Sequence, residues 1–192
     1  MTINTQDYID INRELWEKKV DDHVESKFYD VPAFLRGESS LRIIELDLLP
    51  EVKNKSLLHL QCHFGLDTLS LGRLGAEVTG LDFSPKAIEH AKSLANQTKS
   101  NANFICGDVY DTRDLIKEQF DVVFTSYGTI GWLPDLVKWA NVVNDSLKPG
   151  GEFFFAEFHP FVWMFDDDVK EITYAYRNGG AITGVETESY AD

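Results

Sequence analysis

The sequence is poor in cysteine, in basic residues and in long apolar runs, and each shortage excludes a class of protein. Only Cys62 and Cys106 occur among 192 residues, and they form no CxxC pair. The 18 Lys and Arg against 32 Asp and Glu give a formal net charge of -14, which repels nucleic acid and anionic membranes. No apolar run approaches the roughly 20 residues that span a bilayer.

What remains is the composition of an ordinary globular domain. Hydrophobic residues make up 43% and charged residues 26% of the chain, which suits one core that folds without disulfides. Residues 1–6 have neither the basic nor the apolar region of a signal peptide. We therefore predict a location in the reducing cytoplasm.

The apolar pattern divides this domain into three parts. Residues 1–55 combine helical apolar stripes with many charges and are predicted to form an N-terminal helical cap. Residues 56–158 alternate short apolar runs with helical stretches, which is typical of βαβ units and a parallel sheet. Residues 159–192 are predicted to form a loop and a β-hairpin cover, with strands at 171–177 and 181–190.

The central part predicts an α/β fold, a Rossmann-like doubly wound sheet. Its strands are expected at residues 57–60, 77–81, 103–106, 120–124 and 152–156. Gly75 suits a helix end, Ser84 and Pro85 suit a helix start, and Pro134 begins the last helix. That helix is predicted to present one apolar face, made of Leu136, Ala140, Val143 and Leu147.

Polar residues gather at the predicted carboxyl ends of the strands, where open parallel sheets bind ligands. The first strand leads into Gln61, Cys62, His63, Gly65 and Asp67; the glycine lets a cofactor approach the backbone, and the following helix offers free N–H groups. Asp82 lies twenty residues after Cys62, where an acid accepts hydrogen bonds from ribose hydroxyls. The same cleft is expected to contain Phe83, Ser84, Asp108, Val109, Ser126 and Tyr127.

At these positions the chain resembles the class I S-adenosylmethionine-dependent methyltransferases. Their motifs are matched in order by residues 57–68, 80–84, 107–109, 120–124 and 147–151, and the run from His59 to Gly65 is similar to a bacterial branch of small-molecule-type enzymes. The resemblance implies strand order 3-2-1-4-5 and S-adenosylmethionine as cofactor. It places backbone groups around Gln61 and His63 on the methionine part, Asp82 on the ribose, and Asp108 with Val109 on the adenine.

The chain departs from the family at His59, Gln61 and His63, where an acid and two glycines are usual. His59 supplies no fixed negative charge for the cofactor's amino group. Imidazole and thiolate are zinc ligands, but strand alternation places His59 and His63 on one face and Cys62 on the other. We therefore predict no metal and a packed, hydrogen-bonded role for these side chains. Cys106, two strands away, is too distant for a disulfide.

Four further side chains are candidates for the acceptor side of the cleft. Trp16 and Tyr29 either belong to the core or cover the cofactor and substrate. Trp132 follows the fourth strand and is either a pocket wall or a core anchor. His159 follows the fifth strand near the cleft mouth, where a group that titrates near neutrality is a candidate general base.

These features predict a methyltransferase that moves a methyl group to a small-molecule nucleophile by in-line displacement. Because the donor is an activated sulfonium, positioning and desolvation suffice and a dedicated base is optional. Two alternatives remain. One is a nicotinamide-dependent Rossmann oxidoreductase, which the missing glycines disfavour, and the other is a catalytically silent cofactor-binding module.

The family's sheet continues after the fifth strand with a helix and two more strands, and we expect these to be absent here. The fifth strand, with Phe153, Phe154 and Phe155, would then be an unpaired apolar edge, which folded proteins avoid. We expect either that these residues are part of a longer polypeptide or that the edge is covered. The cover would be the chain's own hairpin or a second subunit, as in a homodimer.

Overall fold

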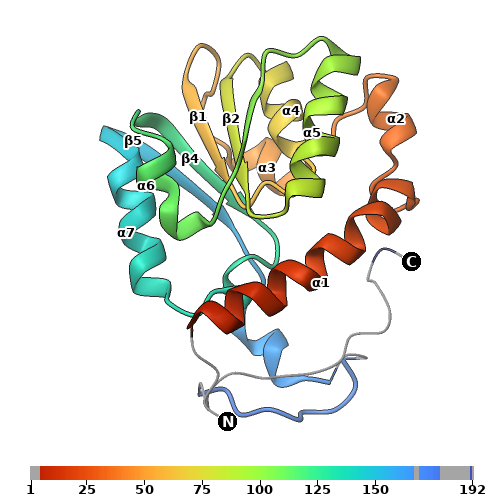
Figure 1. Cartoon of the computed structure of the whole chain (residues 1–192), viewed down its shortest axis with the longest axis vertical. Helices are drawn as coiled ribbons and strands as arrows, with labels where there is room; N and C mark the ends of the chain where they lie inside the picture. Colours follow the sequence, from red (N-terminus) through yellow and green to blue (C-terminus); the bar gives the residue numbers. More distant parts are fainter. Residues whose placement is uncertain (1–4, 167–168, 178–190, 192) are drawn as a thin grey trace.

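The computed structural model describes residues 5–166, 169–177 and 191, and it arranges helices around one parallel sheet (Figure 1). Three helices precede the sheet: α1 (Thr5–Glu25), α2 (Val31–Leu35) and α3 (Ile43–Leu48). The core elements follow in the order β1 (Ser56–Leu60), α4 (Leu66–Arg73), β2 (Glu77–Asp82), α5 (Pro85–Thr98), β3 (Asn103–Cys106), α6 (Thr112–Leu115), β4 (Phe120–Ser126), α7 (Leu136–Ser146) and β5 (Leu147–Ala156). Short 3₁₀ turns are η1 (Val109–Asp111), η2 (Ile130–Trp132) and η3 (Pro160–Met164).

The strands form one sheet in the order β3-β2-β1-β4-β5, and all neighbouring pairs are parallel. Leu57 pairs with Val78 of β2 and with Val122 of β4, so β1 is the central strand. This confirms the predicted Rossmann-like class and strand order. Among the described residues, β5 is an outer strand with no further strand beside it.

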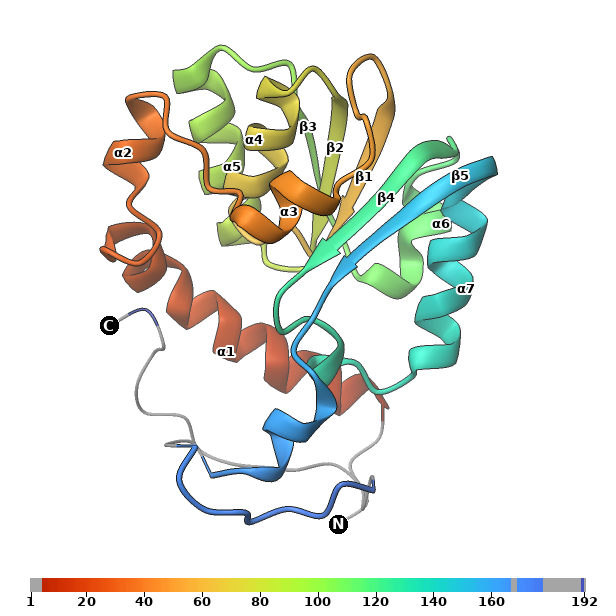
Figure 2. The ribbon, with the colours of Figure 1, turned by 180° about the vertical axis from the view of Figure 1, so that it is seen from behind.

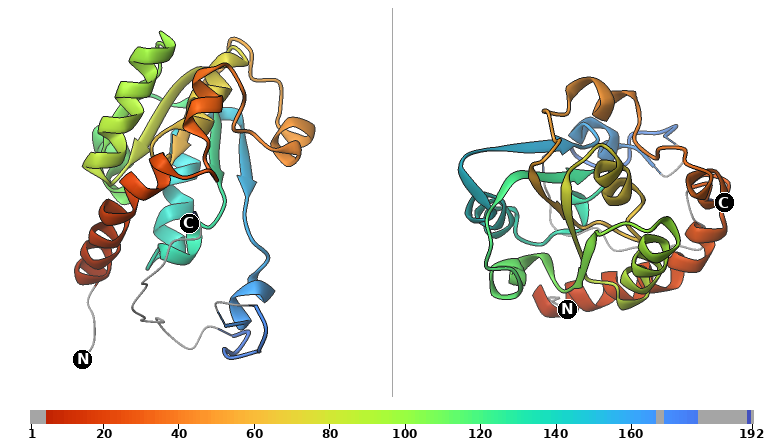
Figure 3. Two further views of the ribbon diagram at one scale, coloured as in Figure 1. Left: turned by 90° about the vertical axis from the view of Figure 1, so that its right-hand side faces the viewer. Right: turned by 90° about the horizontal axis from the view of Figure 1, so that it is seen from above.

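Alternate residues of the strands contribute to hydrophobic clusters on both faces of the sheet. Leu58 and Val123 pack with Trp139 of α7, whereas Leu57 and Phe124 belong to the core of the opposite face. Figure 3 gives side and top views of these layers. Burial of each such side chain contributes about 1.5–3 kcal/mol. Burial on both faces explains why the strands read as continuous apolar runs.

Helix α1 crosses the carboxyl ends of the strands and closes that edge of the sheet (Figures 1 and 2). Val20 of this helix is fully buried in the core, whereas Ile11 of the same helix is 56% exposed. The Glu17 carboxylate accepts hydrogen bonds from Ser84 Oγ at 2.6 Å and from the Lys86 N–H at 3.2 Å. An acid at the start of α5 also interacts favourably with the helix dipole. Residues from the N-terminal segment thus cap a core helix.

The helix boundaries follow the predicted signals, with one correction. Ser84 Oγ accepts from the Ala87 N–H and Pro85 opens α5, as predicted. The last helix begins at Leu136 rather than at Pro134, because Asp135 accepts from the Lys138 N–H and caps it. Of its predicted apolar face, Val143 is buried as predicted, whereas Leu136 and Ala140 are exposed and Leu147 starts β5. The other buried residues of the helix are Trp139, Val142 and Ser146.

The strand predicted at residues 171–177 is not formed. In this segment the structure has one isolated antiparallel bridge, between Phe165 and Ile172, and residues 171–177 are exposed. Within the described residues no strand pairs with this segment, and exposed alternation by itself buries too little apolar surface to hold a ladder. The second predicted strand, 181–190, lies outside the described residues.

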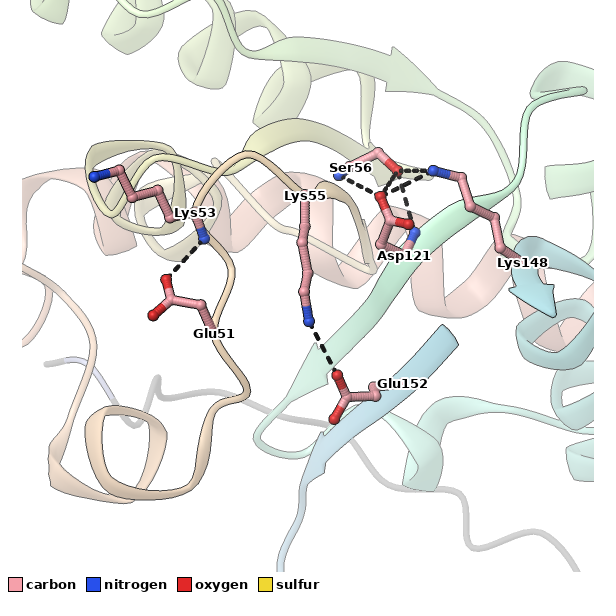
Figure 4. Close-up of polar contacts among 7 residues, drawn as sticks. All are labelled: Glu51, Lys53, Lys55, Ser56, Asp121, Lys148 and Glu152. Carbon is pink, nitrogen blue, oxygen red and sulfur yellow. Dashed lines mark hydrogen bonds and ion pairs between the residues drawn. The ribbon is translucent and has the colours of Figure 1, made fainter. Parts of the chain in front are cut away.

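A polar network joins the amino-terminal ends of β1, β4 and β5 (Figure 4). The Asp121 carboxylate accepts from the Ser56 N–H at 2.9 Å, from Ser56 Oγ at 2.8 Å and from Lys148 Nζ at 2.9 Å. Lys55 and Glu152 form a second ion pair at 3.1 Å. The hydrogen bond from Lys148, followed by those from Ser56, lowers the pKa of Asp121. These contacts fix the edge of the sheet opposite the candidate site.

Candidate functional site

The loop after β1 adopts the backbone of a glycine-rich loop although it contains one glycine. Gln61 has φ 58°, His63 has φ 50° and Gly65 has φ 83°, all left-handed. This conformation costs about 1–2 kcal/mol at a residue with a side chain, so it persists only where contacts hold it. A Cβ on Gly65 would lie 2.7 Å from the Phe104 ring, which is why that position must be glycine.

Asp82 at the end of β2 holds this loop. Its Oδ2 accepts from the His63 N–H at 2.8 Å and its Oδ1 accepts from the Ser84 N–H at 3.0 Å. The residue is 7% exposed, and burial raises its pKa to about 6 against the lowering effect of these hydrogen bonds. Each carboxylate oxygen retains a second lone pair. The group can therefore accept further hydrogen bonds from a diol.

The His63 side chain points to α1 and joins an aromatic cluster. His63 Nε2 and His23 Nδ1 are hydrogen bonded at 2.9 Å, and His23 is fully buried. The rings of Trp16 and Tyr29 lie 5.6 Å and 5.8 Å from the His63 ring. Burial, followed by the nearby His23, lowers the pKa of His63 to about 3, so its imidazole is neutral. The structure thus brings together Trp16, Tyr29 and His63 as one wall over the loop.

His59 and the cysteines occupy separate environments. His59 Nδ1 is hydrogen bonded to Thr68 Oγ1 at 2.8 Å, and burial lowers the pKa of His59 to about 3. The Cys62 thiol is buried and donates weakly to the His63 carbonyl at 3.6 Å. Both Cys62 and Cys106 are free thiols, as predicted. In the described part of the chain, no group of three or more His, Cys, Asp or Glu residues is placed to hold a metal ion.

The predicted adenine-side residues lie at the end of β3. Asp108 Oδ1 accepts from the Tyr110 N–H at 2.9 Å and caps η1, while Val109 is buried. The guanidinium of Arg13, on α1, lies over the Phe83 ring that follows β2, 6.0 Å from the ring centroid. Asp82 and Asp108 thus end neighbouring strands at the same edge of the sheet, as the sequence predicts.

Asp67, Ser126 and Tyr127 meet between α4 and the end of β4. Asp67 Oδ1 accepts from Ser40 Oγ at 2.6 Å and its Oδ2 accepts from Ser126 Oγ at 3.4 Å. Burial raises the pKa of Asp67. Tyr127 has φ 49° and turns the chain away from the strand. Asp67 therefore lies beside the residues that follow β4 as well as beside the first loop.

Glu157, directly after β5, is a structural residue that the sequence analysis missed. Its carboxylate accepts from the N–H groups of Gly128 at 2.6 Å, Thr129 at 2.7 Å, Ile130 at 3.1 Å and Phe158 at 2.7 Å. The Thr129 carbonyl in turn accepts from Gln61 Nε2 at 3.3 Å. An acid after the last strand was the available signal, but its partners are distant in sequence.

The remaining acceptor-side candidates lie in different surroundings. Trp132 packs edge-to-face on Trp16 at 5.5 Å, and its carbonyl accepts from Asn12 Nδ2 of α1 at 3.1 Å. His159 is exposed, and its Nδ1 accepts from the Phe161 N–H at 3.2 Å at the start of η3. Trp132 therefore belongs to the wall formed with Trp16, whereas the base role of His159 stays a prediction.

Comparison with known proteins agrees with this geometry. Residues 57–151 match the family described as methyltransferase domain. The ubiquinone biosynthesis O-methyltransferase of Coxiella burnetii is 30% identical over 155 residues, which are 74% of this chain and 64% of that protein. Its counterpart in Erwinia tasmaniensis is 28% identical over 137 residues, 69% of this chain and 56% of the relative. The chain thus spans less than two thirds of the length of these relatives.

A solved structure shows the same arrangement. The S-adenosylmethionine-dependent methyltransferase from Mesorhizobium loti is 27% identical, with a TM-score of 0.57 over 68% of this chain and 59% of that one. Residues 57–151, which match the domain family, contain β2, β3 and β4, nearly all of β1 and the first half of β5, together with the loops that follow the first four strands. Residues 57–151 therefore form a methyltransferase domain, and the relatives and the fold support a class I S-adenosylmethionine-dependent methyltransferase.

Proposed function

We propose that this chain transfers a methyl group from S-adenosylmethionine, the cofactor of its family, to a small-molecule nucleophile. The observation that carries the proposal is Asp82, a buried carboxylate that anchors the loop after β1 and has lone pairs left for a ribose diol. Gln61 supports the fit, because its buried Oε1 has no hydrogen-bond partner among the described residues. Gly65 keeps the backbone open beside it.

The cofactor contacts follow from these positions. We infer that backbone groups of residues 61–65 bind the methionine part, and that Asp82, next to Phe83 and Ser84, binds the ribose. Asp108 and Val109, which follow β3 beside β2, are proposed to bind the adenine. When bound, the cofactor supplies a methyl group on a sulfonium, which needs an aligned nucleophile more than it needs acid or base catalysis.

On the acceptor side, this chain's residues orient the nucleophile and exclude water. Trp16 of α1 forms an apolar wall with Tyr29 and Trp132, and exclusion of water there would strengthen electrostatic interactions with the acceptor. The net charge of -14 favours neutral or cationic acceptors. His159 is retained as a candidate base outside these walls.

The family assignment disfavours the nicotinamide alternative. A catalytically silent cofactor-binding module remains the second candidate, because His59, Gln61 and His63 replace residues usual in the family. We further propose that the protein acts in the cytoplasm and without nucleic acid. No described helix has the length and apolar character needed to cross a membrane. A homodimer is proposed as one way to cover the outer edge of β5.

A thermal-shift panel tests the proposed function. S-adenosylhomocysteine at 100 times its dissociation constant should stabilise the chain by about 2.7 kcal/mol, whereas NAD should leave the melting temperature unchanged. A shift with NAD and none with S-adenosylhomocysteine would refute the proposal. Stabilisation without methyl transfer to any member of an acceptor library would favour the silent module.

A further inference from the structure

Helix α3 is built with its polar residue inward and its aliphatic residues outward. Glu45 is fully buried, whereas Ile43 is 72% exposed and Leu48 is 70% exposed. One carboxylate oxygen of Glu45 accepts from the Arg42 N–H at 2.8 Å, but the other, Oε1, has no hydrogen-bond partner among the described residues. A buried carboxylate oxygen without a partner costs free energy unless a ligand or water satisfies it.

Two further side chains near Glu45, those of Tyr127 and Asp67, can accept hydrogen bonds from a ligand. The buried Tyr127 hydroxyl has no partner with full hydrogen-bond geometry in the part of the chain that the structure describes. Its neighbour is Glu45: after burial, the side-chain interaction with this carboxylate and then its charge raise the pKa of Tyr127, and the hydroxyl oxygen keeps a lone pair for a donor. Asp67 is the third group, and the nearby charge of Glu45 contributes to its raised pKa after burial. Two carboxylates and a hydroxyl thus converge.

A cation of the chain accompanies these acids. The Arg42 guanidinium lies 5.2 Å from the Phe28 ring and 5.9 Å from the Tyr127 ring. It is close enough to oppose the raised pKa values of both Asp67 and Tyr127. We call Asp67, Glu45, Tyr127 and Arg42 the Asp67 cluster. Its two acids and one base are complementary to a zwitterion, in which an ammonium and a carboxylate share one carbon.

The place of the cluster identifies the zwitterion. Asp67 lies two residues after Gly65, in the first turn of α4, and Tyr127 directly follows β4, the neighbour of β1. The cofactor loop is therefore the nearest ligand-binding backbone. His59, at the family's usual acidic position, is neutral and hydrogen bonded to Thr68. His59 therefore does not supply the negative charge that the family resemblance places beside the cofactor's amino group.

We propose that Asp67 and Glu45, with the Tyr127 hydroxyl, bind the ammonium at the amino-acid end of the cofactor, and that Arg42 faces its carboxylate. This inference rests on the proposed function and gives the cluster the contact that His59 does not supply. Three acceptors match the three N–H donors of a primary ammonium, and a guanidinium matches a carboxylate.

Two probes separate this role from a structural one. S-adenosylhomocysteine contains the amino-acid end, whereas 5′-methylthioadenosine retains the adenosine and lacks that end. Calorimetry on Asp67→Asn should show roughly 10- to 100-fold weaker binding of S-adenosylhomocysteine, the range for a hydrogen bond to a charged group. Binding of 5′-methylthioadenosine should be unchanged. Glu45→Gln should behave alike, and Asp47→Asn, which removes the same charge from the exposed side of α3, should change neither.

The outcomes distinguish this inference from the proposed function. If the wild-type chain binds neither probe, the proposed function fails, and the inference fails with it. If wild type binds both but Asp67→Asn weakens both equally or neither, the cofactor site stands and the inference is overturned. Thermal unfolding of each variant shows whether it is folded. Should Asp67→Asn fail to fold, the probe preference of Glu45→Gln decides the question in the same way.

Discussion

Acidification from pH 7 to pH 5 is expected to destabilise the fold because two histidines are held neutral inside it. His59 is 3% exposed and hydrogen bonded to Thr68, and His63 is packed against His23 and Trp16. Burial lowers the pKa of both imidazoles to about 3. The unfolded chain binds these protons near pH 6.5. A fall in pH therefore stabilises the unfolded chain relative to the folded chain.

The magnitude follows from the pKa differences. The contribution of each neutral histidine to the free energy of unfolding is present above pH 6.5 and is lost as the pH falls towards 3. At pH 5 this loss is about 2 kcal/mol per histidine. Asp82 acts in the opposite direction, because its folded pKa of about 6 is raised. Its contribution is present below its unfolded pKa and is lost as the pH rises through about 6, so acidification to pH 5 returns about 1 kcal/mol. The net loss from His59, His63 and Asp82 is about 2–3 kcal/mol.

Urea unfolding at the two pH values measures this loss. His59→Asn retains a polar group near Thr68 but does not titrate, and it should reduce the pH-dependent loss by about 2 kcal/mol. His159→Asn is the matched control, since His159 is exposed, and it should leave the loss unchanged. The reasoning is refuted if His59→Asn loses as much stability between pH 7 and pH 5 as the wild type.

Three further predictions concern the metal, the turn after β4 and the edge of the sheet. Elemental analysis should find no stoichiometric metal, and tightly held zinc would favour a metalloenzyme. Glu157→Ala removes the acceptor for three successive N–H groups, so amides 128–130 should exchange with deuterium at least roughly tenfold faster; unchanged protection would show that the carboxylate is dispensable. Phe153 is 39% and Phe155 is 40% exposed on β5. Light scattering should therefore show self-association that Phe155→Lys reduces, and a stable wild-type monomer with β5 unprotected would contradict a covered edge.

The sequence predicts those features that local chemistry determines. Ser84 with Pro85 marks the start of α5, and continuous apolar runs mark strands that are buried on both faces. Parallel strands place their carboxyl ends together, so the strand pattern by itself puts Asp82 and the loop containing His63 at one edge of the sheet. Their contact then follows from the strand order.

Features that depend on distant partners could not be predicted. Nothing near His23 indicates that it is hydrogen bonded to His63, and nothing near Glu157 indicates the turn that it holds. Periodicity also misplaced the face of α7, because Trp139 packs against Phe153 and Phe155 of the following strand and sets the rotation of the helix. At residues 171–177, alternation alone predicted a strand that lacks a ladder partner in the described chain.

The most direct test of the cofactor site is calorimetry of S-adenosylhomocysteine binding to the wild type and to Asp82→Ala. The account predicts binding to the wild type and a loss of about 1.5–3 kcal/mol in the variant, as expected for hydrogen bonds to a charged group. Circular dichroism should show that the variant is folded. Unchanged affinity in a folded Asp82→Ala variant would contradict the account, because the ribose would then lie elsewhere.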